Sequence, residues 1–372
     1  MKEKSMKANC SIEDLGQVII SGISGLVLTK EEMEFLEKEN IGGVILFDYN
    51  YQNPKQLALL INSIQQLRRE RPFFICVDFE GGRVRRFKTH FTAWPSMQSI
   101  ARLNSPKIIF EVHSMISTEL KSVGINWNFA PVCDVLTNTT TTAIGDRSFG
   151  YDPENIGQLI TAAIRGMIAN KMISCAKHYP GHGPSEVDSH YGLPVIQKTF
   201  EELEQKDLIP FYKAAKSKVE SIMVGHLLLP KIDPKDCASM SKKIIKHLRD
   251  SLRYNRIIIS DDLQMHSITK TYGEAQVPIQ GINAGNNVLI YRSLDKAKIA
   301  MESLKVAYDN KSLDHQMLQD SIAIINKTKD AYLSDYEEID VMSSGDFSYV
   351  VGCKQHAEYH KDLLEKLSAL GH

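Results

Sequence analysis

The run IIISD at residues 257–261 indicates the fold of this chain. It consists of three isoleucines and a serine, and an acid follows them directly. Near-continuous apolar character over so few residues is typical of a strand that is buried on both faces of a parallel sheet. Runs of similar character recur at residues 18–23, 43–47, 73–78, 125–131, 172–178, 221–226 and 287–291. The sequence therefore predicts eight buried strands.

Helical patterns fill the gaps between these runs. Within residues 55–69, for example, Leu57, Leu60, Ile61 and Ile64 recur at the spacing of one helix face. Comparable patterns cover residues 105–123, 155–170 and 200–216. Strands that alternate with helices eight times predict an α/β fold, the TIM (β/α)8 barrel.

The domain organisation follows from the length of the barrel. We expect a polar N-terminal segment at 1–14 and one barrel-shaped catalytic domain at 15–333. Two helices, 294–309 and 312–333, complete that domain. The remaining residues, 334–372, form a helical C-terminal tail, with a loop and then a helix at 354–370, that packs on the barrel or on a partner.

Composition excludes several classes of protein. The 372 residues include 44 basic and 45 acidic ones, whereas nucleic-acid binders usually show a basic excess, so we expect no nucleic acid partner. No run approaches the roughly 18–20 apolar residues that span a bilayer, so we expect no membrane partner. The polar N-terminus does not resemble a signal peptide, and the six cysteines are widely spaced without a CxxC pair. Both features favour the cytoplasm.

Polar residues end several predicted strands. Asp78, His226 and Asp261 each close one of them, and Lys177 and His178 close another. The carboxyl ends of the strands form the active-site face of a TIM barrel. A single aspartate after a strand is usually a turn or helix cap, but four such strand ends on one rim predict a functional site.

The segment 176–194, AKHYPGHGPSEVDSHYGLP, is the richest in chemistry. Its prolines and glycines prevent a regular helix, so we expect a long loop that leaves a strand. His178 and His182 have the spacing of a zinc pair, but that spacing converges on one metal only in a helix. Because Pro180 and Gly181 argue against a helix, we expect no metal here.

Asp188 and His190 are two residues apart in the same loop, a pattern that is weak evidence alone because both residues are common in loops. In extended or turn backbone they share a face, so Asp188 can accept a hydrogen bond from one imidazole nitrogen. The other nitrogen is then left to move a proton near neutral pH. With Asp261 facing it across the rim, His190 would complete an acid/base and nucleophile pair.

Arginines in two further segments are candidates for recognising carboxylates, phosphates or hydroxyls. In VDFEGGRVRRF (77–87), strict alternation puts Arg83 and Arg85 on one side and Arg86 on the other. In AIGDRSF (143–149) the candidate is Arg147. The alternative for Arg147 is a local surface pair with Asp146.

Taken in order, VDFEGGRVRRF, FAPVCDV, AIGDRSF, KHYPGHG, DSHYGLP and SDDLQM resemble glycoside hydrolase family 3. More narrowly, they resemble the bacterial β-N-acetylglucosaminidases of peptidoglycan recycling. The resemblance runs from about Leu15 to about residue 330. It implies a TIM barrel and a retaining glycosidase that needs no cofactor.

The resemblance also implies residue roles. Asp261 matches the nucleophile, His190 the general acid/base, and Asp188 the partner of that histidine. The residues that match those holding the N-acetylglucosamine ring are Asp78, Arg86, Arg147, Lys177 and His178. His226 lies where the family often has a rim histidine, and we expect it to bind substrate.

The implied substrates are small molecules: N-acetylglucosaminyl-anhydro-N-acetylmuramic acid and its peptide-bearing forms. We expect a monomer or a dimer. The sequence departs from the family at Phe79, which is expected to alter a wall near the sugar, at Asn287, and at Cys133, which is expected in the core.

Other activities are open at this point. The same site would suit an N-acetylglucosaminide phosphorylase or a β-glucosidase. A metal-dependent TIM-barrel hydrolase would use His178, His182, His226 and Asp261. An inactive carbohydrate-binding relative is disfavoured, because a binding module has no need of both a nucleophile and a proton-transfer group.

Overall fold

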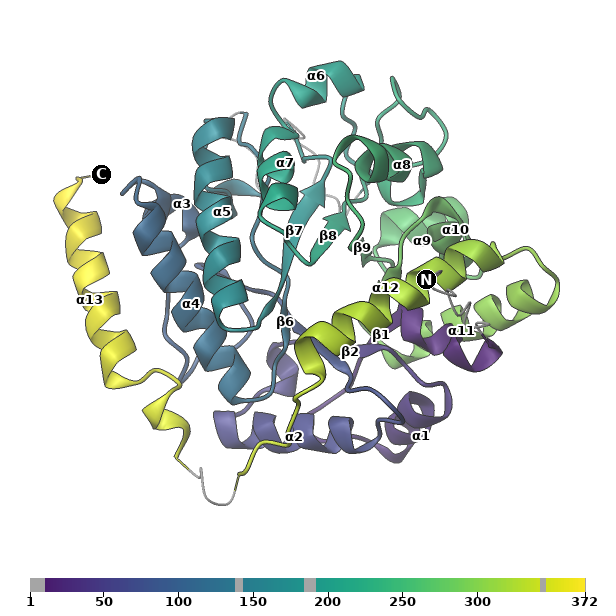
Figure 1. Cartoon of the computed structure of the whole chain (residues 1–372), viewed down its shortest axis with the longest axis horizontal. Coiled ribbons are helices and arrows are strands. Elements are labelled where there is room, and N and C mark those ends of the chain that lie inside the picture. The colour runs from purple at the N-terminus through teal and green to yellow at the C-terminus, as the bar shows by residue number, and fades with distance from the viewer. Residues whose placement is uncertain (1–10, 138–142, 184–191, 342–345, 372) are drawn as a thin grey trace, which may run out of the picture.

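Figure 1 shows the computed structural model of the chain, which describes residues 11–137, 143–183, 192–341 and 346–371. Eight parallel strands close into a barrel in the order β1-β10-β9-β8-β7-β6-β3-β2. These strands are β1 (Ile19–Gly22), β2 (Gly43–Leu46), β3 (Phe74–Val77), β6 (Trp127–Asn128), β7 (Ile173–Tyr179), β8 (Ser221–Val224), β9 (Ile257–Asp262) and β10 (Val288–Tyr291). Each predicted run supplies one barrel strand, so the expected TIM barrel is confirmed.

Helices surround the strands (Figure 1). They include α1 (Lys30–Lys38), α2 (Pro54–Gln66), α3 (Met97–Ala101), α4 (Pro106–Ser122), α5 (Pro153–Ala169), α8 (Lys242–Ser251), α9 (His266–Tyr272), α10 (Val277–Ala284), α11 (Leu294–Asp309) and α12 (His315–Leu333). Asn53, Ser105 and Asp152 each accept a hydrogen bond from a backbone N–H of the first turn, and proline follows each of them. Proline is pre-shaped for that position and its missing N–H needs no partner there, which explains why these helices begin one or two residues away from the starts that apolar spacing predicted.

The single helix predicted at 200–216 is wrong. The structure has two helices instead, α6 (Phe200–Glu204) and α7 (Ile209–Lys216). Pro210 lies in the first turn of α7, where its lack of an N–H is tolerated, whereas within one continuous helix it would remove a hydrogen bond and clash with the preceding turn. The break also buries Asp207, which accepts a hydrogen bond from Lys198 Nζ at 2.5 Å.

A small antiparallel hairpin, β4 (Phe79–Gly81) with β5 (Val84–Arg85), follows β3 and was not foreseen. Its turn uses Gly81 and Gly82, whose φ angles are 99° and 55°. A side chain at Gly82 would also come within 2.8 Å of the Ser96 backbone. Glycine is therefore required here for both conformation and space.

The C-terminal tail packs on the barrel. Helix α13 (Lys354–Ala369) lies beside α4 (Figure 1), and the Tyr359 hydroxyl donates to Glu111 Oε2 at 2.7 Å. His356 Nδ1 lies 2.7 Å from Oε1 of Glu119, a buried carboxylate on α4 that also accepts from the backbone of Thr92. The tail is thus tied to the helix and to the loop after the hairpin.

Candidate active site

A cavity of about 340 Å³ opens at the carboxyl ends of the barrel strands. Its wall contains residues from many of the strand ends and following loops. They are Ile45, Phe47, Asp78, Arg83, Val84, Arg86, Phe129, Ala143, Arg147, Lys177, His178, His182, Met223, Asp261, Asp262, Met265, Ile290 and Arg292. Asp78, Arg86, Arg147, Lys177, His178 and Asp261, which are far apart in the sequence, therefore meet in one cavity, as expected for strand ends of this fold.

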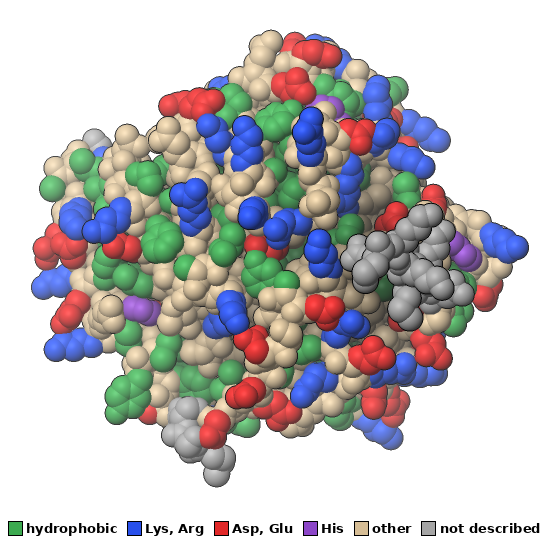
Figure 2. All heavy atoms as spheres, in the orientation of Figure 1, with side chains coloured by type: hydrophobic (Ala, Val, Ile, Leu, Met, Phe, Trp, Pro, Cys, Tyr) green, Lys and Arg blue, Asp and Glu red, His purple; other side chains and the backbone are tan. Residues whose placement is uncertain are grey.

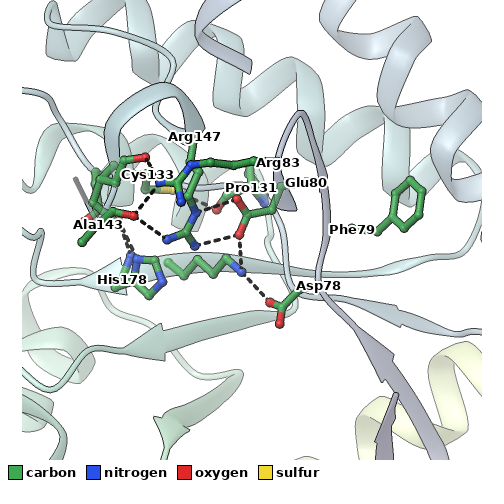
Figure 3. A network of polar contacts seen from close by, with 12 residues as sticks. Asp78, Phe79, Glu80, Arg83, Pro131, Cys133, Ala143, Arg147 and His178 are labelled. Atoms are coloured by element: carbon green, nitrogen blue, oxygen red, sulfur yellow. Dashed lines mark hydrogen bonds and ion pairs between the residues drawn. The ribbon is translucent and has the colours of Figure 1, made fainter. Parts of the chain in front are cut away.

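The floor of the cavity is a network of buried charges (Figure 3). Lys177 Nζ lies 2.7 Å from Asp78 Oδ1 and 2.6 Å from Glu80 Oε1. The guanidinium of Arg147 donates a hydrogen bond to each carboxylate oxygen of Glu80, both at 2.8 Å. Arg86 adds a second cation to Asp78 at 2.8 Å. Cations and carboxylates alternate, so each charge that has left water has a partner.

These contacts hold the carboxylates ionised. Burial alone would raise the pKa of Asp78, but Lys177 and Arg86 lower it well below its usual value. Burial likewise opposes ionisation of Glu80, and Arg147 and Lys177 overcome it, lowering the pKa of Glu80 to about 2. The pKa of Lys177 is raised by the same two carboxylates against the effect of burial. The floor is therefore rigid, charged and fixed in protonation at neutral pH.

Glu80 was missed by sequence reasoning, although a signal was present. Asp78 and Glu80 are two residues apart in extended backbone and so share a face, whereas Phe79 between them points away (Figure 3). Phe79 is buried against Phe87 and Phe91, with ring centroids 6.1 and 5.6 Å away. The expectation that Phe79 alters a wall near the sugar is therefore wrong, because alternation directs it into the core.

A second missed carboxylate, Asp134, orients the histidines. Its Oδ2 lies 2.8 Å from His178 Nδ1, and its Oδ1 accepts from the backbone N–H of His182 at 2.7 Å. Burial would raise the pKa of Asp134, but His178 and its hydrogen bond lower it to about 2. An ionised Asp134 accepts the Nδ1 hydrogen of His178, which leaves Nε2 for the cavity. Asp134 directly follows the apolar start of FAPVCDV, which was the available signal.

Asp261, at the end of β9, has a different environment. Its Oδ1 accepts the backbone N–H of Asp262 at 2.7 Å, and among the described residues no side chain hydrogen-bonds to it. Burial opposes its ionisation, but His178 and His226 nearby lower its pKa. Asp261 is thus an ionised carboxylate facing the cavity with oxygen lone pairs to spare, which is what a nucleophile requires.

His226 does not line the cavity. It is buried, with Nδ1 2.7 Å from Ser239 Oγ and Nε2 3.0 Å from the carbonyl oxygen of Asp262. A carbonyl only accepts, so Nε2 carries the hydrogen and both ring nitrogens are engaged by the protein. His226 is therefore held behind the end of β9 by Ser239 and the Asp262 backbone, and the expectation that it reaches into the cavity is not met.

The arginines differ from the sequence expectation in two ways. Arg83 and Arg86 both line the cavity while Arg85 does not, so the alternation that grouped Arg83 with Arg85 was wrong, because extended backbone covers only Val84–Arg85. The alternative surface pair of Asp146 with Arg147 is also wrong. Asp146 instead accepts from Arg83 Nε at 2.8 Å, and Arg147 turns inward to Glu80.

Asp188 and His190 lie outside the described residues. Their roles therefore stay predictions from the sequence. Within the described part of the chain, no three side chains of His, Cys, Asp or Glu are grouped so as to hold a metal ion. His178 and His182 instead meet edge to face, with ring centroids 5.5 Å apart, and burial lowers the pKa of His182 to about 4 despite Asp134.

The comparison with protein families decides the assignment. The model of the N-terminal domain of glycosyl hydrolase family 3 matches residues 11–327. The chain belongs to glycosyl hydrolase family 3. The fold and the cavity described above are thus those of a family 3 member, and the expectation of a glycoside hydrolase is confirmed.

Named relatives of this family 3 chain agree with one another. It is 34% identical over 319 residues to a beta-hexosaminidase of Nitrosomonas eutropha, covering 83% of this chain and 90% of the relative. A family 3 β-N-acetylglucosaminidase from Paenibacillus superimposes with a TM-score of 0.91 at 29% identity, over 96% of this chain and 69% of that one. A fungal multi-domain family 3 β-N-acetylglucosaminidase superimposes with a TM-score of 0.91 at 34% identity. The match covers 95% of this chain but only 43% of the fungal chain.

Among the described residues of this family 3 chain, no helix is both long and apolar enough to cross a membrane. The described cysteines are all free: Cys76, Cys133, Cys175, Cys237 and Cys353. Cys133 is buried, as expected.

Proposed function

We propose that the chain is a retaining exo-β-N-acetylglucosaminidase that removes terminal N-acetylglucosamine through a covalent bond to Asp261. The ionised carboxylate of Asp261 at the cavity wall, which accepts one backbone N–H and is held by no cation in the described residues, carries this proposal. The names of the relatives, beta-hexosaminidase and β-N-acetylglucosaminidase, support N-acetylglucosamine as the sugar that is removed. A carboxylate that no cation grips keeps its nucleophilicity, whereas Asp78 and Glu80, each held by two cations, are suited to binding and support.

The first step is attack by Asp261 on the anomeric carbon while a general acid protonates the departing oxygen. A glycosyl ester forms at Asp261, and the bond to the leaving group breaks. In the second step the acid, now a base, takes a proton from water, and the water oxygen replaces Asp261 at the anomeric carbon. Two inversions retain the configuration of the sugar.

We assign the acid/base role to His190 and its orientation to Asp188, on the family motif alone. An imidazole paired with a carboxylate titrates near neutral pH, which suits both proton transfers. It also avoids placing a second anion beside the nucleophile. Most retaining glycosidases use two carboxyl groups about 5–5.5 Å apart, so a histidine would be a departure from that plan.

The floor of the cavity supplies groups for sugar hydroxyls. Asp78 offers acceptor lone pairs, and Lys177, Arg86 and His178 offer donors. Because Lys177 and Glu80 are only 2% and 3% exposed, the inner end of the cavity is closed. A closed inner end admits one terminal sugar and leaves the rest of the substrate toward solvent, which supports exo action.

We propose further that the substrates are fragments of turned-over peptidoglycan that carry N-acetylglucosamine on anhydro-N-acetylmuramic acid, with or without peptide. The cytoplasm is the proposed location, and the described free cysteines fit its reducing conditions. No cofactor is required by these steps. The chain is proposed to act as a monomer or a dimer.

Release of nitrophenol from nitrophenyl β-N-acetylglucosaminide, compared with the β-glucoside, tests the sugar assignment. A higher kcat/KM for the N-acetylglucosaminide is expected, and preference for the glucoside would overturn it. Incubation with an activated 2-fluoro sugar, followed by intact-mass and peptide mapping, tests the nucleophile. The label is expected on Asp261, and a label on the neighbouring Asp262 would exclude the proposed mechanism.

A further inference from the structure

The solvent side of the cavity carries an arginine for which no role has been given. Arg292 directly follows β10 and lines the same cavity as Asp261. Its Nε lies 2.9 Å from Asp262 Oδ2, and its side chain is 48% exposed. Among the described residues Asp262 is its one ionic partner, and no hydrogen bond engages either Nη group.

This ion pair is poorly suited to a structural role. The Arg292 side chain is half-exposed, although that of Asp262 is only 21% exposed, so water weakens this ion pair and it contributes less to stability than a fully buried pair. The charges of the floor, by contrast, are buried and each carboxylate is shared by two cations. Asp262 holds the guanidinium at the cavity wall while its two terminal nitrogens are left for another acceptor. That is an arrangement for binding an oxyanion from solvent.

The position of Arg292 identifies the part of the substrate that it meets. The cavity is closed by Lys177 at its inner end and is half-exposed at Arg292. A terminal sugar at the floor would direct its anomeric carbon to Asp261, and the leaving group would extend outward past the neighbouring Asp262. Arg292 therefore lies on the leaving-group side.

Aromatic rings border the same part of the rim. Phe47, in the cavity wall, stacks on Tyr49 with ring centroids 5.5 Å apart and an angle of 19° between the planes. Tyr49 is close enough to Arg292 and Asp262 for their charges to act on its hydroxyl, and its side chain is partly exposed. Such a surface suits a bulky, partly apolar group that also carries a charge.

We propose that Arg292 binds an oxyanion of the leaving group, and that this oxyanion is the free carboxylate of the sugar next to the terminal N-acetylglucosamine. The inference rests on the proposed function and specifies its substrate. A lactyl carboxylate on the leaving sugar would lie where the two Nη groups can hold it in a bidentate pair. A substrate in which a peptide has converted that carboxylate into an amide would lose the contact.

The test compares two substrates that differ by one charge. They are N-acetylglucosaminyl-β-1,4-N-acetylmuramic acid and its methyl ester, assayed by release of N-acetylglucosamine. The substitution Arg292→Gln is expected to lower kcat/KM for the acid by about tenfold, the scale of a charge-assisted hydrogen bond, and to change it for the ester by less than about twofold. Arg292→Lys, which keeps the charge but loses the fork, should retain part of the preference for the acid.

A matched control removes a neighbouring cation that does not line the cavity. Lys296, in the first turn of α11, pairs with Glu274 at 2.6 Å and is 36% exposed. Lys296→Gln should leave the acid-to-ester ratio of kcat/KM unchanged. An equal fall in that ratio for Lys296→Gln and Arg292→Gln would show general electrostatic attraction and overturn the inference.

Two further outcomes separate the claims. If the wild type hydrolyses both acid and ester, and Arg292→Gln leaves the acid-to-ester ratio of kcat/KM unchanged, this inference is overturned and the proposed function stands. If the wild type hydrolyses neither substrate, the proposed function is overturned. The assay is repeated with inorganic phosphate, with detection of sugar 1-phosphate. Formation of that product only when Arg292 is present would show that the oxyanion is an acceptor phosphate, which also overturns the carboxylate assignment.

Discussion

Lys177 and Glu80 form an ion pair of 2.6 Å in which neither side chain is more than 3% exposed. Lys177 belongs to barrel strand β7 and Glu80 to the separate hairpin after β3, so the pair ties the hairpin to the barrel. Removing one member of such a pair leaves a buried charge without compensation, which is far more destabilising than losing an exposed pair. Several expectations about the cavity follow from this contrast.

The substitution Glu80→Gln is expected to lower the free energy of unfolding by roughly 3–5 kcal/mol, because Arg147 and Lys177 lose a shared carboxylate. Urea denaturation would measure it. Asp146→Asn, which breaks the half-exposed pair with Arg83, is the matched control and should cost less than about 1 kcal/mol. Equal effects of the two substitutions would contradict the importance assigned to burial.

Acid stability should depend on the same carboxylates. The folded-state pKa values of Glu80 and Asp134 are both lowered to about 2, below their values in an unfolded chain. Their contribution is therefore complete above about pH 4.5 and is lost as the pH falls toward 2, because the unfolded chain binds protons first. The urea concentration at the midpoint of unfolding should fall as the pH is lowered through this interval. The fall should be less steep in the Glu80→Gln variant. A variant with the wild-type slope would show that Glu80 is not responsible.

Lys329 is expected to make stability depend on pH at neutral to alkaline pH, through a buried cation instead of a buried carboxylate. This α12 lysine is fully buried, its Nζ lies 3.0 Å from Gln17 Oε1 and 4.9 Å from the Phe74 ring centroid, and burial lowers its pKa to about 7. Between pH 10.5 and 7 the unfolded chain binds the proton more tightly, so this group makes stability decrease as pH falls, with no further change below 7. Lys329→Met should raise the free energy of unfolding at pH 7 by about 1–4 kcal/mol and remove that slope. Destabilisation at every pH would refute the expectation.

Loss of the nucleophile has a distinctive chemical signature. Asp261→Ala should reduce kcat on the nitrophenyl substrate at least about 10⁴-fold, the order seen when a nucleophile is removed. Azide, which can enter the space left by the carboxylate, should restore part of the rate and give a glycosyl azide of inverted configuration. Nuclear magnetic resonance of the product distinguishes the two anomers. Rescue that yields the retained anomer would argue against Asp261 as nucleophile.

The acid role of His190 is tested by the leaving group. A good leaving group needs little protonation, so His190→Ala should slow natural disaccharides far more than activated aryl glycosides. Steady-state kinetics on both classes measure the ratio. Equal loss on the two would speak against proton donation by His190.

The sequence was informative wherever one local pattern decides the outcome. Apolar runs identified the barrel strands, and the polar residues that end them located the cavity, because parallel strand ends meet at one face. Local pattern failed where backbone direction changes. The extended backbone of β5 covers only Val84–Arg85, so the alternation that grouped Arg83 with Arg85 failed, and Pro210 divided a helix that looked continuous by apolar spacing.

Contacts between distant residues were the other failure. Asp134 contacts His178 across 44 positions, and Glu119 contacts His356 across 237. No periodicity in the chain encodes either pair. Arg292 was overlooked for a related reason, since one arginine after a strand has no distinguishing neighbour until the fold brings it to Asp262.

The shared carboxylate of Glu119 connects residues beyond the family match to the barrel. The family match stops at residue 327, yet Glu119 on α4 is capped from beyond that point by His356 and by the backbone of Gly352. Thr92, which leads from the hairpin of Arg86 toward α3, depends on the same carboxylate. A chain shortened after residue 327 would remove His356 and Gly352 from that carboxylate and weaken the support of the loop that contains Thr92. Helix α13 and the segment before it thus support, from a distance, the loop that follows the hairpin.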